Sequence, residues 1–368
     1  MNNTIKLVRY SIGVDIKSFF LQNVKMKFYV PVIIINLLFL TGCSKQTVDI
    51  YAAGYEELED GGVAAVYWKN GERIALTNAS GPAWAISIVV SGSDVYIAGF
   101  EASENSMQEA VYWKNGEKTV LTANAVSAWA ASIAVSGSDV YVAGMEMNAR
   151  SRFSAVYWKN GEKNYLSNEP LSSVASAIAV SDSIVYIGGN DLNGEPAGVK
   201  AVYWKNGEKT VLTENSGNAS VSAIAVSGSD IYLAGSEDAV NTYWKNGVKT
   251  AIGDGTTVSS IDSIAVSGSD VYTAGREINE EGKSTAVFWK NRKKTILTEK
   301  NHSGLANAIR VSGKAGPGGP DCYIAGRDTD ADNVSSAVYW INGTKVILPK
   351  GTGVTSATAN DIFLVEKN

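Results

Sequence analysis

Seven carboxylates recur at one position of an internal repeat, each two residues after a glycine that ends a short apolar segment. They are Glu56, Glu101, Glu146, Asp191, Glu237, Glu277 and Asp328. Such a set could bind a cation or a polar ligand, or two members could act as acid and base on a glycosidic bond. The alternative is structural, with one hydrogen bond repeated in every unit. We favour the structural role, because a functional site usually departs from a repeat and these carboxylates follow it.

Two tryptophans do depart from the repeat. Trp84 and Trp129 lie seven residues before a recurrent serine, at a position that other units fill with Val174, Ser220, Ser260 and Leu305. Side by side on one face, two indole rings could form a stacking platform for a sugar or an aromatic peptide side chain. The alternative is that they fill gaps between neighbouring units of the core.

Other reactive side chains are few. Asp328, Asp330 and Asp332 alternate as calcium ligands often do, but the segment has no glycine at the sixth position and no glutamate at the twelfth. His302 is the one histidine of the chain, and we expect it to be a solvated loop residue. Cys322 replaces a repeat valine and is expected to be a small buried hydrophobe. We find no phosphate-binding motif or nucleophile elbow, so we predict no cofactor, no metal and no catalytic residue, with a weak calcium site at the three aspartates as the alternative.

Composition indicates an all-β protein that does not bind nucleic acid. The chain has 368 residues, of which 45% are hydrophobic, only 19% are charged and 36 are glycine. Few charges and many glycines are typical of a protein with many short strands and tight turns. The formal net charge is −5, and the basic residues exceed the acidic ones within the first 42 residues. The remainder is therefore more acidic still, which argues against nucleic acid as a partner, because phosphate binding needs clustered lysine and arginine.

The repeat itself predicts the fold. The string Val-Tyr-Trp-Lys-Asn-Gly recurs with small changes, and its tryptophans lie 40 to 51 residues apart. They are Trp68, Trp113, Trp158, Trp204, Trp244, Trp289 and Trp340. A second string, Asp-Val-Tyr-Ile-Ala-Gly, precedes each of them. This period is that of a β-propeller blade with four antiparallel strands.

One unit illustrates the expected blade. Its four strands, named a to d from the channel outward, are Ser132–Ser136, Asp139–Ala143, Ala155–Lys159 and Glu162–Leu166. Two-residue turns join a to b at Gly137-Ser138 and c to d at Asn160-Gly161. These turns lie on one face of the ring. The b–c and d–a loops lie on the other face and vary between units, so we expect binding there.

The chain ends predict how the ring closes. The first repeat unit begins at residue 48 with a strand b and therefore lacks a strand a. Residues 359–365 match the strand a at 306–312, so the last strand supplies the missing one. We therefore predict a seven-bladed β-propeller over residues 48–368, closed by the C-terminal strand pairing with the N-terminal blade.

The N-terminal segment predicts export. Residues 28–40 form an apolar run of 13 residues after two lysines, which suits a signal peptide and is short for a membrane-spanning helix. Leu40-Thr41-Gly42-Cys43 resembles the lipobox of bacterial lipoproteins. That resemblance implies a signal peptide over 1–42 and a diacylated Cys43 that anchors the chain to a membrane through the tether 43–47. Because Met26-Lys27 would open a signal peptide of ordinary length, Met26 is the alternative translation start. The alternative is an ordinary signal peptide or a membrane anchor. Ser44, in place of an aspartate, favours the outer membrane.

The repeat units resemble those of Gram-negative propeller lipoproteins of unassigned function, over residues 48–365. The expected function is that of a non-enzymatic binding or scaffold lipoprotein of the cell envelope, which binds a protein or a glycan through the b–c/d–a face. A lectin-like glycan binder using Trp84 and Trp129 is one alternative. A glycan-processing enzyme using the seven carboxylates is another.

Overall fold

The computed structural model describes residues 48–367, apart from 104–106, 123–124, 168–171, 195–197, 214–216, 254, 256 and 313–318. The predicted signal peptide 1–42 with its internal Met26, the lipidated Cys43 and the tether 43–47 lie outside the described residues. Within the described ranges, no helix has the length and apolar character needed to cross a membrane.

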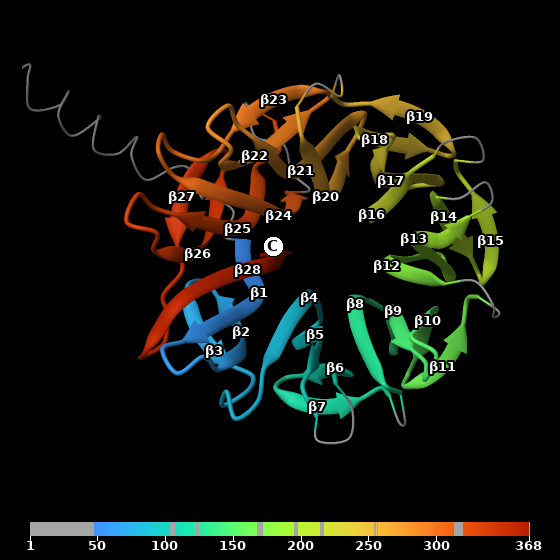
Figure 1. The fold of residues 1–368 in the computed structure, drawn as a ribbon, viewed down its shortest axis with the longest axis horizontal. Coiled ribbons are helices and arrows are strands. Elements are labelled where there is room, and N and C mark those ends of the chain that lie inside the picture. The colour runs from blue at the N-terminus through green and yellow to red at the C-terminus, as the bar shows by residue number, and fades with distance from the viewer. Residues whose placement is uncertain are drawn as a thin grey trace, which may run out of the picture. The chain divides into compact units, whose positions relative to one another are not determined.

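The described chain folds into seven four-stranded antiparallel sheets that form a ring around a central channel (Figure 1). The fold is the predicted seven-bladed β-propeller. In each blade the strands run in order from the channel outward. Blade 1 contains β28 (Val354–Glu366), β1 (Val48–Leu58), β2 (Val63–Lys69) and β3 (Glu72–Ala75). Blade 2 contains β4 (Ala83–Ser91), β5 (Asp94–Glu101), β6 (Glu109–Lys114) and β7 (Glu117–Val120).

The other five blades repeat this order. Blade 3 contains β8 (Ser127–Ser136), β9 (Asp139–Met147), β10 (Phe153–Lys159) and β11 (Glu162–Tyr165). Blade 4 contains β12 (Ser173–Ser181), β13 (Ile184–Gly194), β14 (Gly198–Lys205) and β15 (Glu208–Val211). Blade 5 contains β16 (Ala219–Ser227), β17 (Asp230–Glu237), β18 (Val240–Lys245) and β19 (Val248–Ala251). Blade 6 contains β20 (Ser259–Ser267), β21 (Asp270–Ile278), β22 (Ser284–Lys290) and β23 (Lys293–Ile296). Blade 7 contains β24 (Ser303–Val311), β25 (Cys322–Thr329), β26 (Ser335–Ile341) and β27 (Thr344–Ile347).

The turns form because their residues tolerate a left-handed backbone. At the c–d turn of blade 2, Asn115 and Gly116 have φ of 51° and 87°, which is the two-residue hairpin geometry that Asn-Gly favours. The Asn115 side chain also accepts a hydrogen bond from the amide of Val95 and donates one to Asp94. Lys114 binds Asp94 as well, at 2.9 Å, and this hydrogen bond holds the pKa of the Asp94 carboxyl below its usual value. The recurrent turn residues therefore tie the two turns of a blade together.

Each strand a carries a β-bulge that shapes the channel wall. In blade 2, Ala85 pairs with Gly99 and Ser87 pairs with Ala98, so Ile86 has no partner and faces the channel. A Cβ on Gly99 would collide with the carbonyl oxygen of Trp84, because the bulge brings that carbonyl against the neighbouring strand. This contact explains why every strand b of the repeat needs a glycine. The unpaired bulge residues are Ile86, Ala131, Ser176, Ser222, Asp262, Asn307 and Asn360.

The core lies between neighbouring blades. All seven repeat tryptophans are buried, with relative exposures of 0 to 4%. Trp68 of blade 1 donates its indole N–H to the carbonyl of Pro349, which follows blade 7, at 2.8 Å. Cys322 is also buried and free, and burial raises the pKa of its thiol to about 11, in line with the predicted role of a small hydrophobe.

The ring closes as predicted, through β28 and β1. Their pairing runs from Val48↔Glu366 to Leu58↔Val354. Asp361 of β28 adds a buried link between blades 1 and 2. Its carboxylate accepts hydrogen bonds from Ser87 Oγ and Ile88 N of blade 2, both at 3.0 Å. The same carboxylate pairs with Arg310 of blade 7 at 3.0 Å. One side chain on the closing strand therefore connects three consecutive blades.

Replacing Asp361 by Ala should weaken this closure. It leaves two donors of blade 2 without a partner and Arg310 without its counter-ion, so we expect a loss of about 2–4 kcal/mol in the free energy of unfolding. Chemical denaturation measures the loss, with Asp332→Ala, an exposed loop substitution, as the control. Equal unfolding midpoints for the two variants would show that Asp361 has no closing role.

Candidate functional site

The seven predicted carboxylates are all paired inside their own blades. Each binds a lysine or arginine of strand d at an N···O distance of 2.5 to 3.0 Å. In blade order the partners are Arg73, Lys118, Lys163, Lys209, Lys249, Lys294 and Lys345. No carboxylate side chain is more than 16% exposed. This geometry supports the structural alternative for the ring. The basic partner follows 17 residues later in five blades, a signal that is readable in the sequence.

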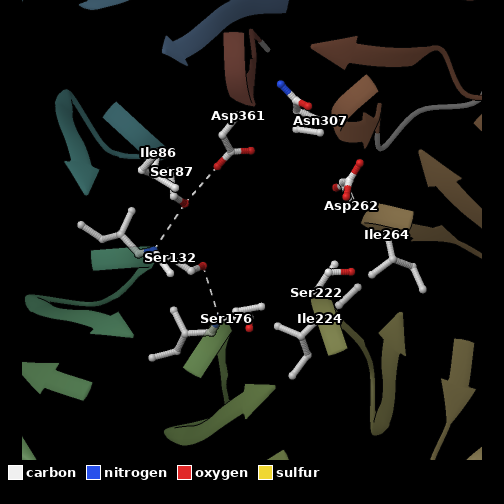
Figure 2. Close-up of a pocket in the computed structure, with 18 of the residues that line it drawn as sticks. Ile86, Ser87, Ser132, Ser176, Ser222, Ile224, Asp262, Ile264, Asn307 and Asp361 are labelled. Atoms are coloured by element: carbon white, nitrogen blue, oxygen red, sulfur yellow. Dashed lines mark hydrogen bonds between the residues drawn. The ribbon is translucent and has the colours of Figure 1, made fainter. Parts of the chain in front are cut away.

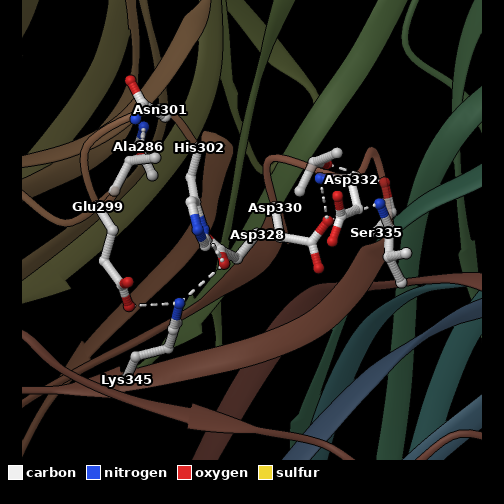
Figure 3. A network of polar contacts seen from close by, with 12 residues as sticks. Ala286, Glu299, Asn301, His302, Asp328, Asp330, Asp332, Ser335 and Lys345 are labelled. Atoms are coloured by element: carbon white, nitrogen blue, oxygen red, sulfur yellow. Dashed lines mark hydrogen bonds and ion pairs between the residues drawn. The ribbon is translucent and has the colours of Figure 1, made fainter.

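The carboxylate of blade 7 has a larger network (Figure 3). His302 Nδ1 lies 2.8 Å from Asp328 Oδ2, and Lys345 Nζ lies 2.8 Å from the same oxygen. Lys345 also pairs with Glu299 at 2.6 Å. His302 lies in a loop, as expected. The expectation that it is solvated is wrong, since its side chain is 19% exposed and bonded to a buried carboxylate. These contacts join the loop before blade 7 to strands b and d of that blade.

The three aspartates of the candidate calcium loop have separate roles. Asp328 faces His302 and Lys345, whereas Asp330 Oδ1 accepts the backbone amides of Asp332 and Val334, at 3.0 and 2.9 Å. Asp330 therefore holds the turn that follows β25. Within the part of the chain that the structure describes, no three His, Cys, Asp or Glu side chains are grouped so that they could hold a metal ion.

Trp84 and Trp129 belong to a row of aromatic rings. They lie in strands β4 and β8, not in the preceding loops, because strand a of blade 3 begins at Ser127 and not at Ser132. Trp84 stacks on Phe100 with centroids 4.9 Å apart, and Phe100 meets the edge of Trp129 at 6.2 Å. The row continues to Tyr55 at 6.4 Å from Trp84 and to Phe153 at 5.8 Å from Trp129. We call these five residues, Tyr55, Trp84, Phe100, Trp129 and Phe153, the aromatic row; it crosses blades 1 to 3, and each ring is partly exposed.

The central channel is a second candidate site, with a cavity volume of about 750 Å³ (Figure 2). Small and aliphatic groups such as Ile86, Ser132 and Ile264 line all of it, and Asp262, Asn307 and Asp361 lie among them. Three bulge side chains donate to a backbone carbonyl of the next blade. These hydrogen bonds are Ser222 to Ile261, Asn307 to Ala359 and Asn360 to Ala85. The bulge residues therefore connect blades as well as line the channel.

Asp262 breaks this pattern of donors. An ionised carboxylate cannot donate, so it cannot make the bond to Ala306 O that its equivalents make to the next blade. Burial raises the pKa of Asp262, and attraction to Arg276 and a hydrogen bond from Ser260 offset the rise only in part. The sequence did not predict this position, because the strand a expected from it begins after the bulge, at the residue that follows Asp262.

Replacing Asp262 by Asn should stabilise the protein at neutral pH. The amide could donate to Ala306 O as Asn307 donates to Ala359, which is worth about 1 kcal/mol. Because the folded-state pKa of Asp262 is raised, the ionised carboxylate opposes folding at pH 7, and this cost disappears as the pH falls through that pKa toward 3.8. Melting temperatures at pH 7 and pH 4 should show a gap that narrows at the lower pH. An Asn variant that melts below the wild type at pH 7 would contradict this account.

Comparison with known proteins shows the fold and goes no further. The sequence matches no protein-family model and no curated protein. A puromycin-hydrolyzing peptidase of Mycobacterium tuberculosis is similar in structure, with 12% identity, a TM-score of 0.54 and alignment over 82% of this chain and 52% of the peptidase. An acylaminoacyl peptidase of Pyrococcus horikoshii is 12% identical, with a TM-score of 0.50, and the alignment covers 84% of this chain and 52% of the peptidase. The β-propeller domain of the Trilobed protease from Pyrococcus furiosus is 11% identical, with a TM-score of 0.48, and the alignment covers 82% of this chain and 95% of that domain. The chain thus spans about half the length of the two peptidases.

Proposed function

We propose that the protein is a non-enzymatic binding propeller whose ligand is a glycan held on the aromatic row. The row carries this proposal, because five partly exposed rings in mutual contact extend across three blades. Sugar rings present flat faces of C–H groups that pack well on indole and phenyl surfaces. Stacking of Trp84 on Phe100 fixes the orientation of both rings, so little conformational entropy is lost when a ligand binds.

The paired carboxylates argue against the glycan-processing alternative. A pair of catalytic carboxylates needs two different environments, one that favours the acid and one that favours the base. In this ring each of the seven has a cationic partner in the same relative place. Scaffold binding of a protein partner on the same b–c/d–a face is the second candidate function, since the aromatic row would also accept aromatic peptide side chains.

The cellular part of the proposal depends on the N-terminal sequence. The apolar run 28–40 and Cys43 support export and lipid attachment, which would place the propeller at the cell envelope, on the outer membrane. Two or three acyl chains on one cysteine would anchor it stably, because each buried methylene contributes ~0.8 kcal/mol.

Glycan-array binding of the detergent-purified full-length protein tests the aromatic row. We expect selective binding, and the double variant Trp84→Ala/Trp129→Ala should lose at least about tenfold in affinity, which corresponds to about 1.4 kcal/mol. Tyr165→Ala removes an exposed aromatic ring from the outer strand β11 and should bind like the wild type. A blank array, or equal loss in both variants, would count against a glycan site on the row.

Metabolic labelling with palmitate tests the anchor. The wild-type protein should incorporate label and sediment with membranes, whereas Cys43→Ser should do neither. Label in the Cys43→Ser variant would mean that lipid is attached elsewhere, and an unlabelled wild type would remove the lipoprotein part of the proposal.

A further inference from the structure

One residue per blade lies between the strand-b glycine and the paired carboxylate. Because side chains alternate along a strand, it points to the opposite face from the carboxylate. We call these residues the mouth ring: Tyr55, Phe100, Met145, Asn190, Ser236, Arg276 and Arg327. Met145 lines the central channel, and two other members, Tyr55 and Phe100, belong to the aromatic row. Equivalent positions in the other blades therefore lie around the mouth of the channel.

The mouth ring is chemically uneven. It is apolar in blades 1 to 3, carries an amide and a hydroxyl in blades 4 and 5, and carries two guanidinium groups in blades 6 and 7. Neither Arg276 nor Arg327 has a hydrogen-bond or ion-pair partner among the described residues, and Arg327 Nε is buried without one. A buried cationic N–H without an acceptor is costly, so an anionic group that accepts from Arg327 Nε would stabilise this position.

The aromatic row shows how close the mouth-ring positions of two neighbouring blades are, and therefore how close Arg276 is to Arg327. In blades 1 and 2, Tyr55 contacts Trp84 of the next blade, and Trp84 contacts its strand partner Phe100. In blades 6 and 7 the same three positions are Arg276, Leu305 and Arg327, with Leu305 paired with Arg327. The two arginines therefore lie on neighbouring blades on either side of Leu305, and blade 7 adjoins blade 1, where the aromatic row begins (Figure 1).

The charges around the two arginines leave a positive excess. Asp262 attracts Arg276 from the bulge position of blade 6. Arg310 and Asp361, also in the channel wall, neutralise each other. The neighbouring carboxylates Glu277 and Asp328 point to the opposite face and bind Lys294 and Lys345. Two guanidinium groups thus face one carboxylate, on a chain whose net charge is −5.

We infer that the glycan is acidic, with a sugar carboxylate bound by Arg276 and Arg327 while neighbouring sugar rings stack on the aromatic row. This inference rests on the proposed glycan-binding function. Guanidinium groups suit the role because their planar N–H pairs match the two oxygens of a carboxylate. A ligand with both features would bind in one orientation across the mouth of the channel.

Calorimetric titration with matched oligosaccharides tests the inference. The probes are hexagalacturonate and its fully methyl-esterified form, which keeps the sugar rings and removes the charge. The full-length protein should bind the acid at least about tenfold more tightly than the ester at low salt, and added salt should reduce the difference. Arg276→Gln/Arg327→Gln should abolish the preference and keep the ester affinity. Arg292→Gln, an exposed arginine on the c–d turn of the opposite face, should keep the preference.

Each contrary outcome has a distinct meaning. Equal affinity for acid and ester, lost in Trp84→Ala/Trp129→Ala, would overturn the acidic preference and leave the proposed glycan function intact. Arginine-dependent binding of the acid that survives the tryptophan substitutions would support the anion site and remove the aromatic row from the proposed function. Absence of binding to both probes would overturn the inference.

Discussion

The close approach of two backbones at the strand-a bulge is the constraint on which the rest of the structure depends. In blade 2 the carbonyl of Trp84 presses against Gly99, where a side chain has no room. The bulge sends one residue of each blade into the channel. The residue after the glycine then lies at the channel mouth, and the next one points to the opposite face and meets strand d. One local contact, repeated seven times, therefore sets three rings of side chains.

These three rings differ in how freely they vary. The carboxylate ring is nearly uniform, because each member must reach a lysine or arginine of its own blade. The bulge ring varies more, and three of its members still serve as donors to the next blade. The mouth ring varies most, from phenylalanine to arginine, since its side chains meet no requirement common to all blades. Variation that the scaffold does not dictate is where binding specificity can develop.

Much of the fold was predictable from the sequence, whereas much of the site was not. The Asn-Gly turns, the tryptophan spacing and the match of residues 359–365 to a strand a predict seven blades and their closure, because each is a local signal. The bulge shows in the sequence only through the recurrent glycine of strand b, and it shifts the alternation of strand a by one residue. Counting by twos therefore could not show that Asp262 faces the channel. The strand a expected for blade 3 began at Ser132, whereas β8 begins at Ser127 and includes Trp129.

The arrangement of the mouth ring bears on how a ring of similar blades could bind one ligand in one way. A seven-fold set of identical sites would accept a ligand in seven equivalent orientations. In this propeller the apolar arc of blades 1 to 3 and the cationic pair of blades 6 and 7 occupy two different, adjoining parts of the same ring. Asp361 fixes blades 7, 1 and 2 to one another, so the spacing between the two regions is held by the closing strand itself. The residue that completes the fold therefore also preserves the asymmetry that a ligand would recognise.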